Sequence, residues 1–489
     1  MTLETSVSAE RAPTNSVPPR PDTHDLAPVL ERLRAAQRAR GTVSYETRVA
    51  WLDKLEKMLL RRKDDIARAI SQDFGNRSRV ETLVAEVVVT VEGIRHTRAH
   101  LKEWMTPRKA EVSWLFQPGR AEVIAQPLGV VGIISPWNYP IQLAAAPLAD
   151  ALAAGNGAML KPSELTPVTS ELIRQMIAET FEPDHVTVVT GGPEVGEAFS
   201  RLPFDHLIFT GSTQVGRMVM RAAAENLVPV TLELGGKSPA LVGRDYPLAT
   251  AATRVVSGKL FNAGQTCIAP DYALVPAERR DEFVGAFQRA VAELYPTVVT
   301  NGDYTSVVSD RHYARLVAHL DDARARGARV IEVNPGGETS DRATRKLLPH
   351  LVLDATDDMT VMQDELFGPI LPVRTYTSID EAIGYVNDRP RPLALYYFGN
   401  DKAETARVIH ETTSGGVTVN DVMLHIAQHD MPFGGVGPSG MGAYHGKAGF
   451  DALSKLKPVF YQSGINGTGL LRPPFGRMMN VVLKLLLND

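Results

Sequence analysis

The sequence contains almost no cysteine, since Cys267 is the only one among 489 residues. A single thiol excludes any disulfide within the chain, which favours a reducing, cytoplasmic setting. A marked charge imbalance is also lacking, because 52 Lys and Arg residues face 56 Asp and Glu residues and leave a net charge of −4. No basic stripe is present, so the sequence predicts no contact with nucleic acid.

Long hydrophobic runs are missing as well. No apolar run approaches the ~18 residues that a membrane-spanning helix needs, and the N-terminus lacks the apolar core of a signal peptide. Residues 1–24 are rich in Pro, Ser and Thr and predict a disordered leader. The remaining composition, 44% hydrophobic and 22% charged, is typical of a globular protein of about two to four domains.

Short apolar strands alternate with helical segments through the chain. A helical region from about 26 to 104 precedes predicted strands at 130–134, 157–161, 186–189, 206–210 and 230–234, with helices at 141–155 and 167–180. Apolar strands that alternate with helices indicate a parallel sheet covered on both faces. A second α/β region follows from about residue 235 and includes the segment around Cys267.

Two glycine motifs have different interpretations. "GSTQVG" (211–216) follows a predicted strand and opens a helix, so its backbone N–H groups can bind a phosphate. A plain β–α turn remains the alternative. "GVGPSG" (435–440) matches G-x-G-x-x-G, but no strand precedes it and Pro438 lies inside it, so we interpret it as a tight turn with positive φ.

Charged residues follow another strand in "LKPSE" (160–164). Lys161 and Glu164 lie at its carboxyl end, where α/β folds bind ligands, and they can hydrogen-bond the hydroxyl groups of a ribose. A solvated, charged loop is the alternative interpretation.

Three further motifs supply possible partners for the cysteine. "SPWNYP" (135–140) contains Asn138, whose amide can donate to an oxyanion, and "LELGGKSP" (232–239) contains Glu233, a possible general base. "QDELFGP" (363–369) contains Glu365 and Phe367 before a Gly-Pro turn. Each motif alone also fits a structural role as a capped turn, a surface acid or a packed aromatic.

Together and in this order, the motifs resemble the aldehyde dehydrogenase superfamily from about Leu26 to Gln462. "GQTCIAPDY" and "MPFGGVGPSGMGAYHGKAGFD" (431–451) are similar to its class 3 branch of fatty, aromatic and coniferyl-type aldehyde dehydrogenases. A lone cysteine is usually a small buried hydrophobe. The resemblance instead implies that Cys267 is the nucleophile.

The resemblance implies a mechanism in two stages. The Cys267 thiolate attacks the aldehyde, and the Asn138 side chain and the Cys267 backbone N–H stabilise the oxyanion of the thiohemiacetal. Hydride transfer to the nicotinamide leaves a thioester, which a water molecule activated by Glu233 hydrolyses to an aromatic or medium- to long-chain acid. The implied cofactor is NAD, and this branch resembles enzymes that also use NADP.

The resemblance also assigns cofactor and substrate contacts. The implied cofactor residues are Lys161 and Glu164 at the adenosine ribose, Gly211 and Ser212 near the pyrophosphate, Glu365 at the nicotinamide ribose and Phe367 beside the nicotinamide. Tyr139 and Ser257 are candidates for the lining of the substrate pocket. Ser257 stands where we expect relatives to carry a larger, often aromatic residue, which predicts a wider or more polar pocket.

The implied fold has two doubly wound (Rossmann-like) parallel-sheet domains and a bridging β-arm that pairs two subunits into a homodimer. The predicted boundaries are 25–106 and 130–234 for the NAD(P)-binding domain, 235–422 for the catalytic domain, 107–129 and 423–460 for the arm, and 461–489 for an amphipathic tail.

Two other functions remain as alternatives. A CoA-acylating aldehyde dehydrogenase is expected to lack the base, so Glu233 argues against it. A non-catalytic relative on the same scaffold would not need Cys267, Glu233 and Asn138 together. His96 and His100, and likewise His425 and His429, are spaced four residues apart, but no acidic third ligand is evident nearby, so we expect no metal site.

The C-terminal segment "GRMMNVVLKLLLND" predicts an amphipathic helix with one polar stripe. At ~1.5 Å per residue the segment is too short to cross a hydrocarbon core of about 30 Å. It can lie on a membrane surface or pack on protein near the substrate entrance. Its only two cationic residues, Arg477 and Lys484, attract anionic lipid weakly, which favours protein.

Overall fold

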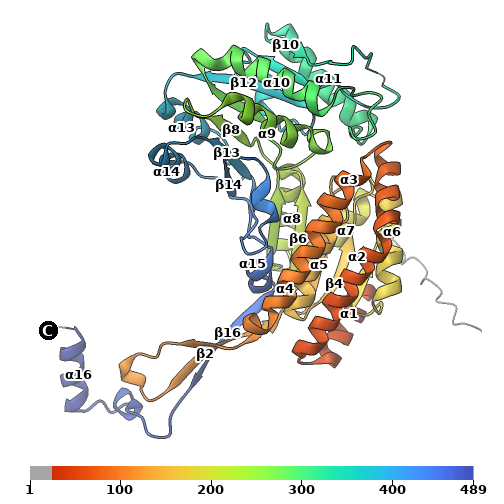
Figure 1. The fold of residues 1–489 in the computed structure, drawn as a ribbon. Coiled ribbons are helices and arrows are strands. Elements are labelled where there is room, and N and C mark those ends of the chain that lie inside the picture. Colours follow the sequence, from red (N-terminus) through yellow and green to blue (C-terminus); the bar gives the residue numbers. More distant parts are fainter. Residues whose placement is uncertain (1–24, 341, 488–489) are drawn as a thin grey trace, which may run out of the picture.

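Two α/β lobes and a projecting arm make up the computed structural model, which describes residues 25–340 and 342–487 (Figure 1). The predicted leader, 1–24, lies outside the described residues. The two parallel-sheet lobes confirm the predicted fold class.

The first lobe is built on a six-stranded sheet with the order β15-β7-β6-β3-β4-β5. Its strands are β3 (Val130–Ile134), β4 (Gly157–Lys161), β5 (Val186–Val188), β6 (His206–Gly211), β7 (Val230–Leu234) and β15 (Gly440–Met441). All pairs are parallel except that of β15 with β7. The chain changes direction across the sheet between β3 and β6, and such a switch point opens a crevice at the carboxyl ends of the strands.

Helices cover both faces of this sheet because its strands are apolar on both sides. One face packs against α2 (Tyr45–Phe74), α4 (Val89–Met105), α5 (Gln142–Ala154) and α6 (Pro167–Thr180). The other face packs against α1 (Ala27–Arg40), α7 (Pro193–Ser200) and α8 (Thr213–Ala224). Between α2 and α4 lie the short α3 (Arg79–Thr82) and a π-helical turn (Leu83–Val88).

The second lobe has a seven-stranded sheet with the order β10-β11-β12-β9-β8-β13-β14. Its strands are β8 (Pro239–Val242), β9 (Tyr272–Pro276), β10 (Arg329–Glu332), β11 (His350–Leu353), β12 (Ile370–Tyr376), β13 (Ala394–Phe398) and β14 (Gly416–Val419). Its helices are α9 (Leu248–Leu260), α10 (Arg280–Leu294), α11 (Asp310–Ala325), α12 (Thr360–Gln363), α13 (Ile379–Asn387) and α14 (Lys402–Glu411). Only β10 runs antiparallel to its neighbour.

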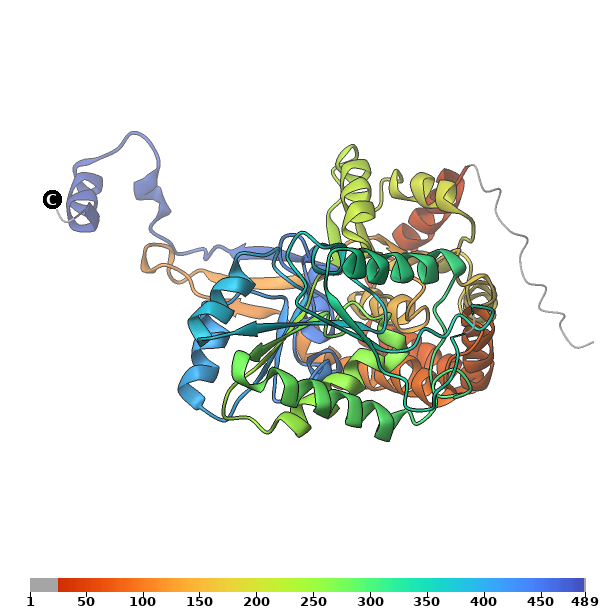
Figure 2. The same ribbon diagram turned by 90° about the horizontal axis from the view of Figure 1, so that it is seen from above.

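The arm is a three-stranded antiparallel sheet of β1 (Arg108–Ala110), β2 (Arg120–Pro127) and β16 (Ser454–Tyr461). It extends away from both lobes in Figures 1 and 2. The predicted arm segment 423–460 is divided by the structure. Its first part returns to the first lobe, where β15 pairs with β7 and α15 (Gly446–Ala452) packs on α5, and only β16 belongs to the arm.

A glycine explains this return of the chain to the first lobe. Gly440 lies opposite Glu233 at φ +153°, and a Cβ there would come within 2.4 Å of the Leu232 carbonyl oxygen. Only glycine therefore permits this close pairing. The predicted turn at 435–440 is also present, with Gly437 at φ +63°.

The tail forms α16 (Arg477–Leu487) beyond the free end of the arm (Figures 1 and 2). Its apolar side chains stay exposed, for example Val481 at 67% and Leu485 at 71%. The helix therefore packs on neither lobe of its own chain. Within the described ranges, no helix is both long and apolar enough to span a membrane.

Candidate active site

A cavity of about 660 Å³ lies where the carboxyl ends of β3, β6 and β7 face the second lobe. Cys267, Glu233 and Asn138 line it together, although they come from three distant parts of the chain. The crevice at the switch point of the first sheet thus opens onto the loop that carries the single thiol.

The Cys267 loop begins with backbone that is rarely adopted by ordinary residues. Asn262 and Ala263 have φ values of 52° and 51° and precede Gly264 at φ 76°. This sharp turn carries the chain from α9 into the cavity. Burial, followed by the nearby Glu365 and Glu233 carboxyls, raises the pKa of the Cys267 thiol to about 12. Nucleophilic chemistry at this sulfur therefore needs a base or a compensating positive charge.

Asn138 follows β3 and is buried. Its Nδ2 donates to the backbone oxygen of Gln265 at 3.2 Å, which ties the amide to the Cys267 loop. An amide fixed beside the nucleophile can donate its second N–H to an oxyanion.

Glu233 is the last but one residue of β7 and is 2% exposed. Neither of its carboxyl oxygens has a hydrogen-bond partner in the part of the chain that the structure describes. Burial raises the pKa of Glu233 well above its ordinary value. A buried carboxyl with a raised pKa beside a thiol is suited to take up and release protons.

The residues predicted to bind the adenosine ribose form an ion pair at the end of β4. Lys161 Nζ lies 2.7 Å from Glu164 Oε2. Burial opposes ionisation of Glu164, but the hydrogen bond and charge of Lys161 outweigh it and lower the pKa of that carboxyl. Glu164 is therefore ionised at neutral pH.

Gly211 and Ser212 line the cavity where α8 begins. The Ser212 side chain caps this helix by accepting from the Val215 N–H at 3.4 Å. The first N–H groups of α8 thus point toward the cavity, as a phosphate site requires.

Glu365 and Phe367 line the same cavity. Glu365 Oε1 is buried and finds no hydrogen-bond partner among the described residues, and burial, with the charge of Asp271, raises its pKa to about 8. The Phe367 ring lies edge-on to Trp137, with centroids 5.4 Å apart. A carboxyl with one oxygen free of hydrogen bonds, close to aromatic rings and a helix N-terminus, fits a nicotinamide dinucleotide.

The structure places the two candidate pocket residues outside this cavity lining. Tyr139 is buried, and its hydroxyl lies 2.6 Å from Thr266 Oγ1. Ser257 lies on the exposed side of α9. Their contact with substrate remains a prediction.

The lining residues that sequence reasoning missed include Trp137, His312 and Arg315. Arg315 on α11 donates to the backbone oxygens of Glu365 and Leu366 at 3.0 and 2.6 Å. Trp137 lies inside a motif already identified, whereas α11 has no glycine or strand-end signal that would place it at a site. No group of three or more potential metal ligands occurs within residues 25–340 and 342–487.

Comparison with known proteins gives one family. Residues 11–459 match the family described as "Aldehyde dehydrogenase family". A "Probable coniferyl aldehyde dehydrogenase" of Caulobacter vibrioides is 54% identical over 92% of this chain and 94% of its own length. A structure described as the substrate-bound state of Staphylococcus aureus AldH is 38% identical, with a TM-score of 0.89 over 94% of this chain and 99% of that one. A Mycobacterium tuberculosis aldehyde dehydrogenase complexed with NAD+ is 28% identical, with a TM-score of 0.82 over 92% of both chains.

Proposed function

The chain belongs to the aldehyde dehydrogenase family and is an NAD(P)-dependent aldehyde dehydrogenase, and from this premise we propose that it oxidises aromatic, coniferyl-type aldehydes to their acids on Cys267. The observation that carries the proposed site is the convergence of Cys267, Glu233 and Asn138 on one cavity. The 54% identity to the Caulobacter relative supports the substrate class. Medium- and long-chain aliphatic aldehydes are the alternative substrates.

The residues divide the chemistry between two stages. Cys267 gives up its thiol proton to solvent water, and its sulfur, as the thiolate, forms a bond to the aldehyde carbon. The Asn138 side chain and the Cys267 backbone N–H donate to the resulting oxyanion. Bound NAD supplies the acceptor for the substrate hydride, which leaves a thioester on Cys267. Glu233 then removes a proton from water, whose oxygen attacks the thioester and releases the acid and the thiol.

The proposed cofactor contacts lie partly in this cavity and partly at the end of β4, where Lys161 and Glu164 stand outside the cavity lining. The Lys161–Glu164 pair is proposed to bind the adenosine ribose, and Gly211 and Ser212 the pyrophosphate at the N-terminus of α8. Glu365 would bind the nicotinamide ribose, and Phe367 would pack beside the nicotinamide.

An aldehyde panel assayed with NAD and NADP tests the substrate proposal through kcat/KM. Coniferyl-type and other substituted aromatic aldehydes are expected to give the largest values. A clear preference for short aliphatic aldehydes would contradict the proposed substrate class, while leaving the family assignment unaffected.

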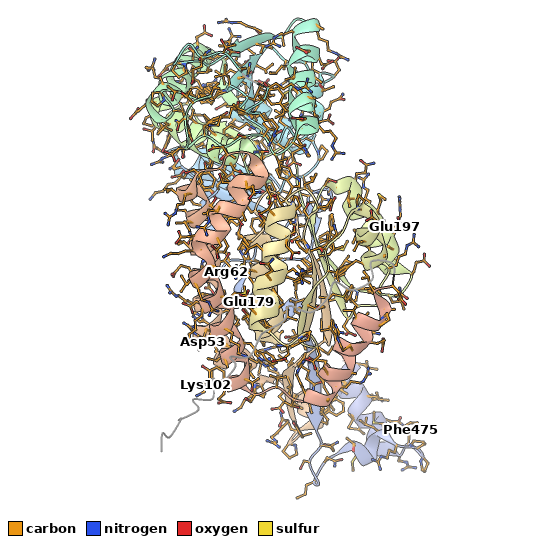
Figure 3. The ribbon with its side chains drawn as sticks, turned by 90° about the vertical axis from the view of Figure 1, so that its right-hand side faces the viewer. Asp53, Arg62, Lys102, Glu179, Glu197 and Phe475 are labelled. Atoms are coloured by element: carbon orange, nitrogen blue, oxygen red, sulfur yellow. The ribbon has the colours of Figure 1, made fainter. Side chains whose placement is uncertain are left out.

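Glu164→Gln is expected to improve the use of NADP relative to NAD by roughly tenfold, or about 1.4 kcal/mol. The native carboxylate can accept from the ribose diol and repels a 2′-phosphate, and the amide removes the repulsion. The ratio of kcat/KM for the two cofactors measures the effect. The matched control is Glu179 of α6, which also forms an ion pair. Its partner is Arg62 of α2 at 2.9 Å, and both are labelled in Figure 3. Glu179→Gln should leave the ratio unchanged, and a strong native preference for NADP would contradict this role of Glu164.

The arm is proposed to pair two subunits into a homodimer. Its exposed side chains include Leu456 at 44% and Phe460 at 49%. Apolar groups of this size on a projecting sheet are typical of surfaces that a partner covers. The single cysteine, which must stay reduced to act, supports a cytoplasmic location.

Deletion of 470–489 is expected to change KM several-fold for long or bulky aldehydes and much less for short ones. Because α16 lies beyond the free end of the arm, the protein surface that it covers would belong to the partner subunit. Steady-state kinetics across a series of chain lengths measure the effect. Unchanged kinetics, together with sedimentation of the full-length protein with liposomes, would favour membrane-surface contact instead.

A further inference from the structure

A buried ionic cluster lies behind the two loops that carry Asn138 and Cys267. It consists of Arg77, Glu81 and Glu86, all from the segment between α2 and α4. The side chains of Arg77 and Glu86 are 0% exposed. None of the three lines the cavity, so the chemistry described above does not use them directly.

One part of the cluster fixes the loop between β3 and α5. Arg77 Nη1 donates to Glu86 Oε1 at 2.9 Å and to the backbone oxygen of Asn138 at 3.0 Å. Glu86 Oε2 accepts from the backbone N–H groups of Ile141 and Gln142, both at 2.9 Å. The backbone of the amide donor is thus held by charge-assisted hydrogen bonds on both sides of Tyr139.

The other part of the cluster fixes the Cys267 loop. Glu81 Oε1 accepts from the backbone N–H of Asn262 at 3.1 Å, where the chain has positive φ. Asn262 Nδ2 in turn donates to the backbone oxygens of Asn138 at 3.2 Å and Gln265 at 3.1 Å. The Gln265 oxygen is the same atom that the Asn138 amide contacts. Arg77 and Glu86 therefore hold one loop, Glu81 holds the other, and Asn262 joins the two.

A third connection runs through an aromatic ring. The Arg77 guanidinium lies over the Tyr139 ring, 4.8 Å from its centroid. The Tyr139 hydroxyl lies 2.6 Å from Thr266 Oγ1, one residue before the nucleophile. Arg77 thus contacts the loop between β3 and α5 directly and the Cys267 loop through Tyr139.

The π-helical turn explains how the carboxyls of Glu81 and Glu86, five residues apart in the sequence, both reach the two loops. On an α-helix, residues three and four apart are neighbours and residues five apart diverge. The wider turn at Leu83–Val88 changes this spacing, so Glu81 and Glu86 both face the catalytic loops. Single π turns of this kind occur frequently at functional sites.

Stability alone does not account for this cluster. A buried ion pair is a poor stabiliser compared with packed apolar side chains. Burial raises the pKa of both Glu81 and Glu86. Arg77 Nε and Nη2 have no hydrogen-bond partner among residues 25–340 and 342–487, which adds to the cost. The directed hydrogen bonds to Asn138, Ile141 and Gln142 are what apolar side chains could not supply.

We propose that Arg77, held by Glu86, is a positioning residue that fixes the Asn138 amide as the oxyanion donor, with Glu81 fixing the Cys267 loop against it. The proposal rests on the oxyanion role given above to Asn138. Because Arg77 acts through Asn138, its removal should impair the chemical step rather than the binding of cofactor or substrate.

Arg77→Lys tests this proposal, since lysine keeps the charge but cannot donate to Glu86 and Asn138 in the same planar geometry. The expected loss in kcat/KM is about 100-fold, the size seen when one oxyanion donor is lost, with KM for NAD unchanged. Arg48→Lys is the matched control. Arg48 is also buried and donates to a backbone oxygen, that of Ala153 at 2.9 Å, but it lies away from the cavity. Arg48→Lys should lower the melting temperature but leave kcat/KM within about twofold of the native value.

A double-mutant cycle separates positioning from general destabilisation. Arg77→Lys should cost about 100-fold in the native background but less than about threefold once Asn138→Ala has removed the group it positions. Additive losses, or a loss no larger than that of Arg48→Lys, would overturn the proposal. If Arg77→Lys does not fold, Glu86→Gln replaces it in the cycle, because the amide oxygen can still accept from α5 while the ion pair is lost.

The same cycle distinguishes the two proposals. Full activity of Asn138→Ala would overturn the oxyanion role and this inference with it. A large loss in Asn138→Ala with an additive effect of Arg77→Lys would overturn only the role of Arg77.

Discussion

Cys267→Ala is expected to abolish aldehyde oxidation, with a loss in kcat of at least about 10⁴-fold. The substitution removes the sulfur that forms the covalent bond to substrate, and no second thiol exists in the sequence to replace it. The fixed donors near the site cannot compensate, because they stabilise an oxyanion that no longer forms. Production of NADH with a coniferyl-type aldehyde measures the loss.

A folding control accompanies this variant. Cys267 is only partly buried against the core of the second lobe, and alanine removes a single sulfur atom, so Cys267→Ala should bind NAD with unchanged affinity and melt within a few degrees of the native protein. Residual turnover above about one per cent would show that another group acts as nucleophile, contrary to covalent catalysis on this sulfur.

The main strands of the first sheet could be predicted from the sequence because their signals are local. The helix Pro167–Thr180 and the strand Val130–Ile134 have the predicted bounds, since apolar runs and a proline at the helix start identify them without tertiary information. The motifs around Cys267, Glu233 and Asn138 lie at strand ends or in loops, which is why their convergence could be expected.

Other features depend on contacts between distant segments. The return of β15 to the first sheet requires the close approach of Gly440 to Leu232, and nothing in "GPSGMG" indicates that partner. Arg77 contacts Asn138, 61 residues away, and its segment reads as ordinary helix in the sequence. The π turn that directs Glu81 and Glu86 inward likewise leaves no periodicity distinct from that of an α-helix.

Glu233→Gln is expected to fail differently from Cys267→Ala. The variant should still form the thioester, because Cys267 and Asn138 are intact, and so should give a burst of NADH close to one equivalent per active site. Steady-state turnover should then fall by about 10²- to 10⁴-fold, because no base activates the water that hydrolyses the thioester. Rapid-mixing measurements of NADH separate the burst from the slow phase.

The pH dependence follows from the environment of Glu233. Burial raises the pKa of this carboxyl well above its ordinary value, so its basic form is scarce at low pH and grows as pH rises through that pKa. Hydrolysis of the thioester should therefore accelerate with pH in the native enzyme. In Glu233→Gln the slow phase should lose this dependence, since the amide does not titrate.

Hydroxylamine tests whether the trapped species is a thioester. This nucleophile needs no general base, so it should attack the acyl-enzyme of Glu233→Gln, release a hydroxamate and restore turnover, while Cys267→Ala stays inactive. Full steady-state rates in Glu233→Gln would remove the base assignment. Rescue of turnover by CoA at low concentration, in the variant and the native enzyme alike, would instead show that the acyl group passes to a thiol, because a CoA-acylating enzyme does not depend on the Glu233 carboxylate near the end of β7.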